Sequence, residues 1–390
     1  MKIVHFLPAL IKGGGERVAA DLANAAASDG HEVTVLAAFH VDENLLRNRL
    51  SPEIDVRYLA PGVTGRFQRY LAGLPWIWKN WAWLASQDIL HCHLTQAAVY
   101  GTLISLLRRM TGGARPAVVE TYHAVGMPIP SWHRWLHAWM CARRDGIVLM
   151  AKDDFWSGFM RKHPDLPSAL IANGVDATSG KVSCEVQLAY RKTVQIPESC
   201  ELVLGTVGQF RSERKPHIIA GIFSRLAQRL PNHVHFLMVG AGAELKTVHS
   251  RLSDLGLAAR IHTPGIADDP RVPMSVMDLY LTLNVGPITG IAALEAAFAG
   301  IPIIALQLDA DYKPGDDDWI WSHHDPQAIA DHAAELLSSA KARDDLARRQ
   351  HDYVEAHCTL EAMHAEYSAF YACVLAKRDR NRQGVGRIPN

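Results

Sequence analysis

The chain has 390 residues, a length that suits two domains better than a single core. Its 40 basic and 40 acidic residues give a formal net charge of zero, so it lacks the positive field that recruits nucleic acid, and no nucleic-acid partner is expected. No apolar run reaches the roughly 18 residues that cross a bilayer, and the first run is too short for a signal peptide. These features predict a cytoplasmic globular protein.

The first half of the chain alternates short apolar runs with helical stretches. A strand over residues 2–7 is followed by a glycine turn from Gly13 to Gly15, a helix over 16–28 and a strand over 32–39. A β–loop–α–β unit of this kind opens a doubly wound parallel sheet. Further strands are predicted over 55–59, 88–91, 117–122, 146–150 and 169–172.

After a polar linker with a small helix, over 177–200, a second alternating set begins. Its predicted strands are 201–207, 234–239, 260–262, 278–283 and 303–306, and three helical segments close the chain, 326–339, 340–357 and 360–377. The pattern predicts an α/β protein with two Rossmann-like doubly wound domains that face a central cleft, where the carboxyl ends of the strands would hold ligands. The predicted domains are 1–180, 181–365 and a C-terminal helix, 366–390, that packs back on the first.

The segment 286–302 is predicted to form a loop, a short helix and a stop. Thr289 can cap the helix, and Gly300 can end it. Glu295 falls on the apolar face of this helix, where a carboxylate is costly unless it is hydrogen-bonded. It either reaches solvent or a basic residue, or accepts hydrogen bonds from a bound diol such as a ribose.

The glycine turn does not carry the dinucleotide fingerprint. Gly13 and Gly15 match its first two glycines, but Val18 takes the place of the third. A nicotinamide cofactor is therefore not expected. The turn either brings backbone amides to a phosphate or an acceptor, or is needed only for tight packing.

Six scattered cysteines form no C-x-x-C pair, so neither a disulfide framework nor a zinc site is indicated. The tight cluster of His91, Cys92 and His93 follows an apolar stretch and is interpreted as the end of a strand. Asp309 and Asp311 are interpreted as a polar loop, and no metal is expected.

Two stretches, 66–83 and 132–144, interleave tryptophans with basic residues. Such a composition suits peripheral contact with a membrane at its inner face. The alternative is that the aromatic rings pack in the first domain while the basic groups face water.

Six segments resemble, in order, those of the retaining glycosyltransferases of family 4, which have the GT-B fold. They are 13–18 (glycine-rich opening), 121–123 (T-x-H), 171–176 (I-x-N-G-V-D), 206–216 (G-R-x5-K), 239–242 (V-G-x-G) and 294–302 (second half of E-x7-E). The resemblance implies a hexosyl or related transferase of polysaccharide biosynthesis that uses neither metal nor cofactor. It would move a sugar from a nucleotide-sugar donor to a glycan or lipid-linked acceptor, with retention at the anomeric carbon.

The resemblance also implies residue roles. Lys215 would contact the donor diphosphate, Arg211 or Arg214 would add positive charge, and His123 would lie beside the reacting centre. Glu295 would bind the ribose. The implied donor-binding residues are Gly14, Gly15, Gly208, Gln209, Gly240, Pro287, Ile288, Thr289, Gly290, Ile291 and Glu295.

Two positions depart from the family pattern. Gln209 stands where the family has an arginine, and Pro287 stands where it has the first glutamate of its E-x7-E motif. Three readings follow: an active enzyme with a divergent donor pocket, an impaired GT-B protein that binds nucleotide or a partner glycosyltransferase, or a nucleotide-sugar epimerase.

Overall fold

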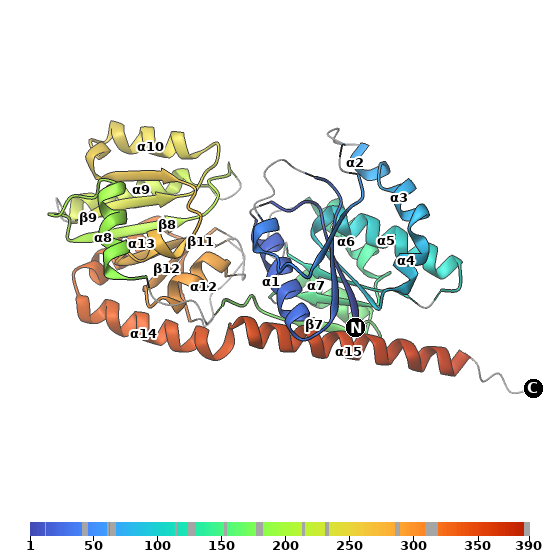
Figure 1. Ribbon diagram of the computed structural model, residues 1–390. Coiled ribbons are helices and arrows are strands. Elements are labelled where there is room, and N and C mark those ends of the chain that lie inside the picture. Colours follow the sequence, from blue (N-terminus) through green and yellow to red (C-terminus); the bar gives the residue numbers. More distant parts are fainter. Residues whose placement is uncertain are drawn as a thin grey trace, which may run out of the picture. The chain divides into compact units, whose positions relative to one another are not determined.

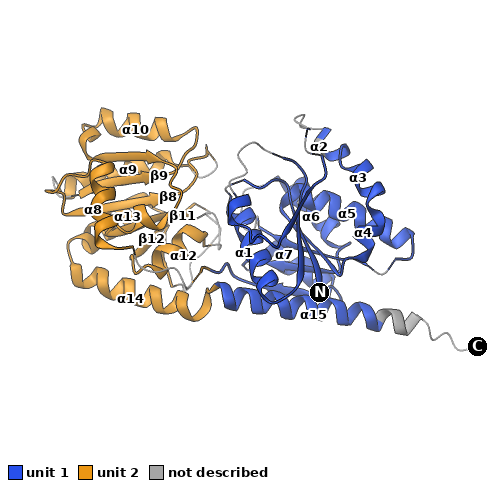
Figure 2. Ribbon diagram, in the orientation of Figure 1, with its two compact units in different colours: residues 1–174, 360–390 blue, residues 175–359 orange. Residues whose placement is uncertain are grey.

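The chain forms two compact units, seen in a computed structural model (Figures 1 and 2). Unit 1 comprises Met1–Gly174 and Leu360–Asn390, and unit 2 comprises Val175–Thr359. Each unit is a parallel sheet covered by helices, which confirms the predicted pair of Rossmann-like domains. The structure describes residues 1–11, 13–40, 46–60, 62, 68–113, 115–123, 130–151, 154–176, 182–212, 215–230, 234–284, 289–308 and 319–385.

The sheet of unit 1 has seven strands in the order β3-β2-β1-β4-β5-β6-β7. The strands are β1 (Lys2–Leu7), β2 (Glu32–Ala37), β3 (Asp55–Tyr58), β4 (Ile89–His93), β5 (Ala117–Tyr122), β6 (Gly146–Leu149) and β7 (Ser168–Leu170). Its helices are α1 (Gly14–Ser28), α2 (Gln68–Leu71), α3 (Leu74–Lys79), α4 (Trp81–Ser86), α5 (Leu94–Met110), α6 (Ser131–Cys141), α7 (Asp154–Lys162) and α15 (Leu360–Val385), with a 3-10 turn at Arg47–Arg49.

The two faces of this sheet differ in polarity, because successive side chains of a strand point to opposite faces. One face is apolar and packs against Tyr100 and Ile104 of α5; its central members are Val4, Phe6, Leu90, Cys92 and Val118. The other face carries His5, His91 and His93, and His5 is the register partner of His91. This polar face is buried as completely as the apolar one.

Helix α15 packs on the polar face of unit 1 (Figure 1). The Tyr371 hydroxyl lies 2.6 Å from Nδ1 of His91, and the Tyr367 hydroxyl lies 2.9 Å from Oγ1 of Thr121. Gly146 in β6 leaves room for this helix, since an added Cβ would lie 2.7 Å from atoms of Phe370 and Val374. The last helix therefore completes the core of the first unit.

The sheet of unit 2 has six strands in the order β10-β9-β8-β11-β12-β13. The strands are β8 (Leu202–Val207), β9 (Val234–Val239), β10 (Ile261–Gly265), β11 (Leu279–Asn284), β12 (Ile303–Gln307) and β13 (Trp321–His323). The helices are α8 (Cys184–Thr193), α9 (His217–Arg229), α10 (Leu245–Asp254), α11 (Arg271–Met274), α12 (Ile291–Phe298), α13 (Pro326–Leu337) and α14 (Ala340–His357), with a 3-10 turn at Ala258–Arg260. Phe223 of α9 stacks on Phe236 of β9 at 4.3 Å in the centre of this core.

Local differences from the predicted elements have simple causes. The edge strand β13 was not predicted, because three residues rich in aromatic and polar groups give no apolar alternation. Helix α12 is capped by Gly290 in an extended conformation rather than by the Thr289 side chain. Gly300, with φ of 80°, ends it as expected. Among the described helices, none has the length and apolar character to cross a bilayer.

Candidate active site

The glycine turn of unit 1 lies at the carboxyl end of β1 and starts α1. An added Cβ on Gly15 would lie 3.0 Å from Cδ2 of Leu94 and 3.4 Å from Nδ1 of His123, so a larger residue would require these side chains to shift. Leu94 itself has a φ of 68°, in the left-handed region that non-glycine residues rarely adopt. Gly14, by contrast, is exposed and has no atom within 4 Å of an added Cβ.

His123 follows β5 and is partly buried beside Gly15. Its Nε2 atom lies 3.2 Å from Nδ1 of His93, the last residue of β4. Burial lowers the pKa of His123 to about 4, although the charge of Glu120 acts in the opposite direction. The His123 ring is therefore neutral at physiological pH and can offer one N–H and one lone pair.

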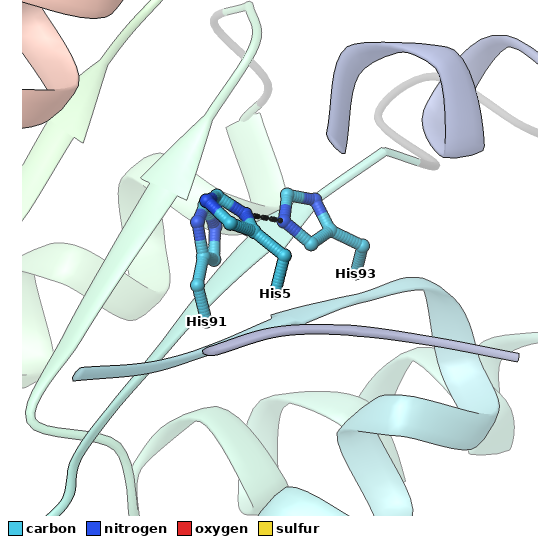
Figure 3. Close-up of side chains that lie close together, drawn as sticks. All are labelled: His5, His91 and His93. Atoms are coloured by element: carbon cyan, nitrogen blue, oxygen red, sulfur yellow. Dashed lines mark hydrogen bonds between the residues drawn. The ribbon is translucent and has the colours of Figure 1, made fainter. Parts of the chain in front are cut away.

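His5, His91 and His93 form a tight buried cluster (Figure 3), and their ligand atoms lie within 4.8 Å of one another. Hydrogen-bond partners occupy five of their six ring nitrogens: Nδ1 of His5 with Nε2 of His93, Nδ1 of His93 with His123, and both nitrogens of His91 with Tyr371 and Thr121. A metal ion would have to displace several of these partners. The cluster is better described as a hydrogen-bonded network at the end of β4.

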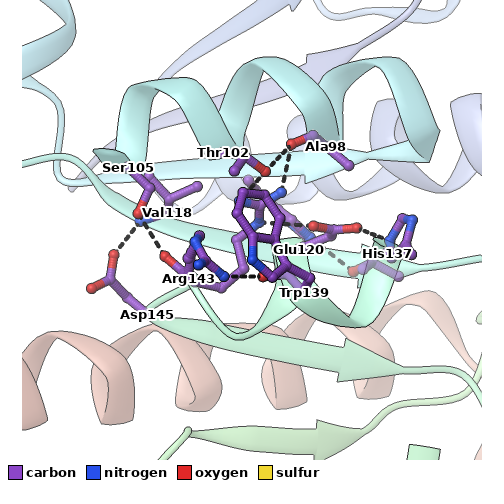
Figure 4. A network of polar contacts seen from close by, with 12 residues as sticks. Ala98, Thr102, Ser105, Val118, Glu120, His137, Trp139, Arg143 and Asp145 are labelled. Atoms are coloured by element: carbon purple, nitrogen blue, oxygen red, sulfur yellow. Dashed lines mark hydrogen bonds and ion pairs between the residues drawn. The ribbon is translucent and has the colours of Figure 1, made fainter. Parts of the chain in front are cut away.

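Glu120 anchors β5 from the opposite face of the sheet (Figure 4). Its carboxylate lies 2.5 Å from Nε2 of His137 and accepts a hydrogen bond of 2.8 Å from Nε of Arg144. Burial by itself raises the pKa of Glu120, but the charges of Arg144 and His137 and their hydrogen bonds outweigh burial and lower it to about 2. Arg144 also donates to Ala98 and Thr102, so a buried ion pair fixes β5, the strand that His123 follows.

Two turns of unit 2 meet backbone to backbone at the carboxyl ends of β8 and β9. Gly208 N–H donates to the carbonyl of Val239 at 3.0 Å, and Phe210 N–H donates to Ala241 at 3.0 Å. Gly240 has a φ of 135°, and a Cβ there would lie 1.9 Å from the Gly208 carbonyl oxygen. The turn therefore needs glycine at position 240.

The predicted phosphate segment leaves this turn and enters α9. Lys215 has a φ of 45°, and its N–H donates to the Ser212 carbonyl at 2.9 Å, which fixes the direction of the residue. Lys215 and Arg211 are exposed, and neither makes an ion pair within the described ranges. Gln209 is exposed and lines a small pocket of about 20 Å³. Arg214 lies outside the described residues.

Glu295 lies on α12 and is partly buried between the buried residues Leu294 and Ala296, close to its predicted place on the apolar face. The charge of Glu295 contributes to the pKa of Arg271 in α11. The pKa of Arg271 is raised chiefly by hydrogen bonding to Asp269, with further contributions from Glu295 and Asp176. Thr289 is partly buried and Gly290 exposed just before α12, whereas Pro287 and Ile288 lie outside the described residues.

The aromatic stretches divide between core and surface. In the first, Trp76 and Trp83 contact edge to face at 5.9 Å and pack on the apolar core, while Trp78 is 82% exposed. In the second, α6 exposes Trp132, Trp135, Leu136 and Trp139. Arg144, one of the basic residues of the stretch 132–144, does not face a membrane or water but is buried in the Glu120 ion pair.

Comparison with known protein families decides the assignment. Residues 12–178 match the family model described as Glycosyltransferase Family 4, and residues 201–339 match the one described as Glycosyl transferases group 1. The chain belongs to the family 4 glycosyltransferases.

Relatives of this family 4 glycosyltransferase are distant in sequence and close in fold. It is 22% identical over 301 residues to N-acetyl-alpha-D-glucosaminyl L-malate synthase of Bacillus anthracis, covering 75% of this chain and 76% of the relative. It is 22% identical over 180 residues to the lipopolysaccharide core biosynthesis glycosyltransferase LpsE of Rhizobium meliloti (strain 1021), covering 45% and 51%. The crystal structure of Anabaena HepE with UDP and glucose superposes with a TM-score of 0.78 at 17% identity, covering 96% of this chain and all of HepE.

The sequence analysis of this family 4 glycosyltransferase singles out His123 and interprets His93 as the end of a strand, which it is, but gives His93 no link to His123 and does not name His5. The alternation of His91 and His93 along one strand places them on one face, which the sequence indicates. Which strand lies beside which, and in what register, is not written in any local pattern. The contact from His5 to His93 and on to His123 depends on that register.

Proposed function

We propose that the chain transfers a sugar from a nucleotide-sugar donor to a hydroxyl of a glycan or lipid-linked acceptor. The acceptor oxygen bonds to the anomeric carbon as the bond from that carbon to the diphosphate breaks, with overall retention and without a metal. The hydroxyl proton passes to the departing diphosphate. No carboxylate is needed as a base in this scheme.

Lys215 stabilises the leaving diphosphate, which gains negative charge as the sugar departs, and Arg211 or Arg214 assists. Glu295 accepts hydrogen bonds from the ribose hydroxyls. The remaining donor-binding residues in the proposal are Gly14, Gly15, Gly208, Gln209, Gly240, Pro287, Ile288, Thr289, Gly290 and Ile291.

One observation carries this proposal. Lys215 is held in the left-handed backbone region at a turn, while its side chain is exposed and has no carboxylate partner among the described residues. Strained backbone of this kind concentrates at functional sites. A fixed lysine without a counterion beside glycine turns at the carboxyl ends of parallel strands supports an anionic ligand such as a diphosphate.

A binding and turnover screen tests the proposal. Ligands that bind the native state raise its stability, by about 2.7 kcal/mol at a hundredfold excess over Kd. UDP, GDP and ADP and their sugars are screened by thermal shift, beginning with UDP-glucose because HepE is crystallised with UDP and glucose. Transfer or hydrolysis supports the proposal. Binding without turnover would favour the impaired GT-B protein, the alternative that Gln209 and Pro287 suggest. A new nucleotide sugar formed without acceptor would indicate an epimerase.

We also propose that this cytoplasmic enzyme contacts a membrane through α6 and α7. Trp132 and Trp135 are 69% and 60% exposed, and Arg143 lies 3.6 Å from the ring centre of Trp139. A groove of about 470 Å³ is lined by Trp135, Trp139, Phe155 and Phe159 and edged by Arg143 and Lys162. Tryptophans beside cations suit the interface of an anionic bilayer.

Flotation with vesicles of anionic phospholipid tests the membrane proposal. Trp132→Ala combined with Trp135→Ala is expected to reduce the bound fraction several-fold. Leu188→Ala, at an apolar position of unit 2 that is 60% exposed, serves as the matched control and should bind as the wild type does. Equal binding by all three proteins, or none by the wild type, would contradict a membrane contact at α6.

A further inference from the structure

Three imidazoles form a continuous chain from β1 through β4 to the residue that follows β5. Nδ1 of His5 lies 3.2 Å from Nε2 of His93, and Nδ1 of His93 lies 3.2 Å from Nε2 of His123. His5 and His93 are fully buried, and only the far end of the chain, His123, is partly exposed. Figure 3 shows the contact between His5 and His93.

All three rings are neutral. Burial lowers the pKa of His5 to about 3 and that of His123 to about 4, and it holds the pKa of His93 well below its usual range. A neutral imidazole has one N–H and one lone pair. Each ring that donates from one nitrogen must therefore accept at the other, so both hydrogen bonds of the chain run in the same direction.

Only two arrangements satisfy this condition. In the first, His5 donates to His93 and His93 donates to Nε2 of His123, which leaves Nδ1 of His123 as an N–H. In the second, every bond is reversed, and Nε2 of His5 carries an N–H. Nε2 of His5 is buried and has no hydrogen-bond partner among the residues that the structure describes. Orphaned buried N–H groups are rarer than orphaned acceptors, which favours the first arrangement.

We propose that His5 and His93 are positioning residues that hold His123 as its Nδ1–H tautomer. In this state His123 presents a hydrogen-bond donor beside Gly15, where its Nδ1 lies 3.4 Å from the place of a Gly15 Cβ. The group it recognises is an oxygen acceptor, such as a sugar hydroxyl or a phosphate oxygen. The role of His123 in sugar transfer rests on the proposed function, whereas the tautomer of His123 does not.

The other polar groups on this face leave the chain intact. Both nitrogens of His91 are occupied by the hydroxyls of Tyr371 and Thr121, so His91 packs beside the chain without entering it. His364 of α15 acts on His5 only through its charge and forms its own pair with Asp29 at 2.8 Å. The direction of the chain is therefore set from the His5 end.

Nitrogen-15 NMR of the full chain tests the tautomer directly, since two-bond correlations in the ring distinguish Nδ1–H from Nε2–H. His123→Asn assigns the signal. The wild type is expected to show His123 and His93 as Nδ1–H tautomers. His5→Phe removes the first donor, so His123 should shift toward Nε2–H although His5 does not contact it. His235→Phe, which removes a buried histidine contact of 2.9 Å to His262 in unit 2, should leave the His123 signal unchanged.

A second pair of variants tests the same tautomer if His5→Phe does not fold. His93→Asn retains an N–H donor near the position of Nδ1 and is expected to preserve the His123 tautomer, whereas His93→Leu is expected to lose it. An Nε2–H tautomer of His123 in the wild type, or identical His123 signals in the Asn and Leu variants, would overturn the proposal.

Kinetics separate this inference from the proposed function. If transfer is found, His5→Phe should lower kcat about tenfold with little change in the donor KM, because the change acts through the orientation of a proton at His123. If no donor is bound or turned over, the proposed function fails, while the NMR readout still decides the tautomer.

Discussion

Lys215 combines a left-handed backbone with an exposed, unpaired ammonium group in the described structure. Lys215→Ala is expected to lower transfer by about 10²–10³-fold, the usual loss when one fixed group that stabilises transition-state charge is removed. The melting temperature should stay unchanged, because the side chain contributes no buried contact. Lys246→Ala, at an exposed position of α10, is the matched control. Full activity of Lys215→Ala would contradict the proposal that Lys215 stabilises the leaving diphosphate.

Gly240 tests the close approach of the two turns in unit 2. Gly240→Ala places a Cβ 1.9 Å from a carbonyl oxygen at a φ of 135°, and we expect it to destabilise the protein by about 1–3 kcal/mol or more. Gly221→Ala is the control, since Gly221 is exposed within α9 and has no neighbour within 4 Å of an added Cβ. It should stabilise the protein by up to about 1 kcal/mol. Urea unfolding measures both; a neutral Gly240→Ala would contradict the described turn.

The family resemblance implies roles for individual residues, but it does not predict the geometry around them. Gly15 lies beside His123, and the backbone of Gly240 approaches that of Gly208, but the roles of these residues in binding stay predictions. The sequence could not give the unusual φ of Lys215 or the chain that leads to His123. Those features depend on turns and on strand register, which are set by packing far along the chain.

Helix α15 is tied to the sheet by hydroxyl groups as well as apolar contacts. Tyr371→Phe leaves Nδ1 of His91 buried without its partner at 2.6 Å, and we expect a loss of about 1–3 kcal/mol in stability. Cys373→Ser, at an exposed position of the same helix, should change stability by less than about 0.5 kcal/mol. Chemical denaturation of both variants is the measurement. Equal stability would mean that α15 is held by its apolar contacts alone.

Elements with strong local signals were predicted well, and weak ones were not. Strand β5 and helix α14 have the predicted bounds, because apolar alternation and a capped helical period mark them clearly. The short helices α3 and α4 are not predicted from the sequence, because some of their tryptophans pack on the core and others are exposed, which gives no helical period. The prediction that Thr289 caps α12 is wrong, because the N-cap position is occupied by Gly290 in an extended conformation.

The buried histidines make the stability of the whole protein depend on pH. The pKa values of His5 and His123 are about 3 and 4 in the folded state, and those of His91 and His93 are also well below the ordinary value of 6.5. Between pH 6.5 and about 4 the unfolded chain binds more protons than the native one, so stability rises with pH across this window and is lost as pH falls.

For each such histidine, the free energy of unfolding should fall by about 1 kcal/mol as the pH is lowered from 7.5 to 5.5. Urea unfolding at several pH values measures the slope. His5→Phe should give a shallower slope than the wild type, whereas His357→Asn, at an exposed position of α14, should leave it unchanged. A pH-independent stability from pH 7.5 to 5.5 would show that the cluster is not neutral and buried.

Because α15 belongs to unit 1 but follows unit 2 in the chain, the order of synthesis and the order of assembly differ. During translation the seven strands of unit 1 are made first, yet their polar face lacks the cover of α15 until residues beyond 360 leave the ribosome. Unit 2 is contiguous and has no such wait. The nascent first unit therefore gains the Tyr371 partner of His91 only when the last helix has been made.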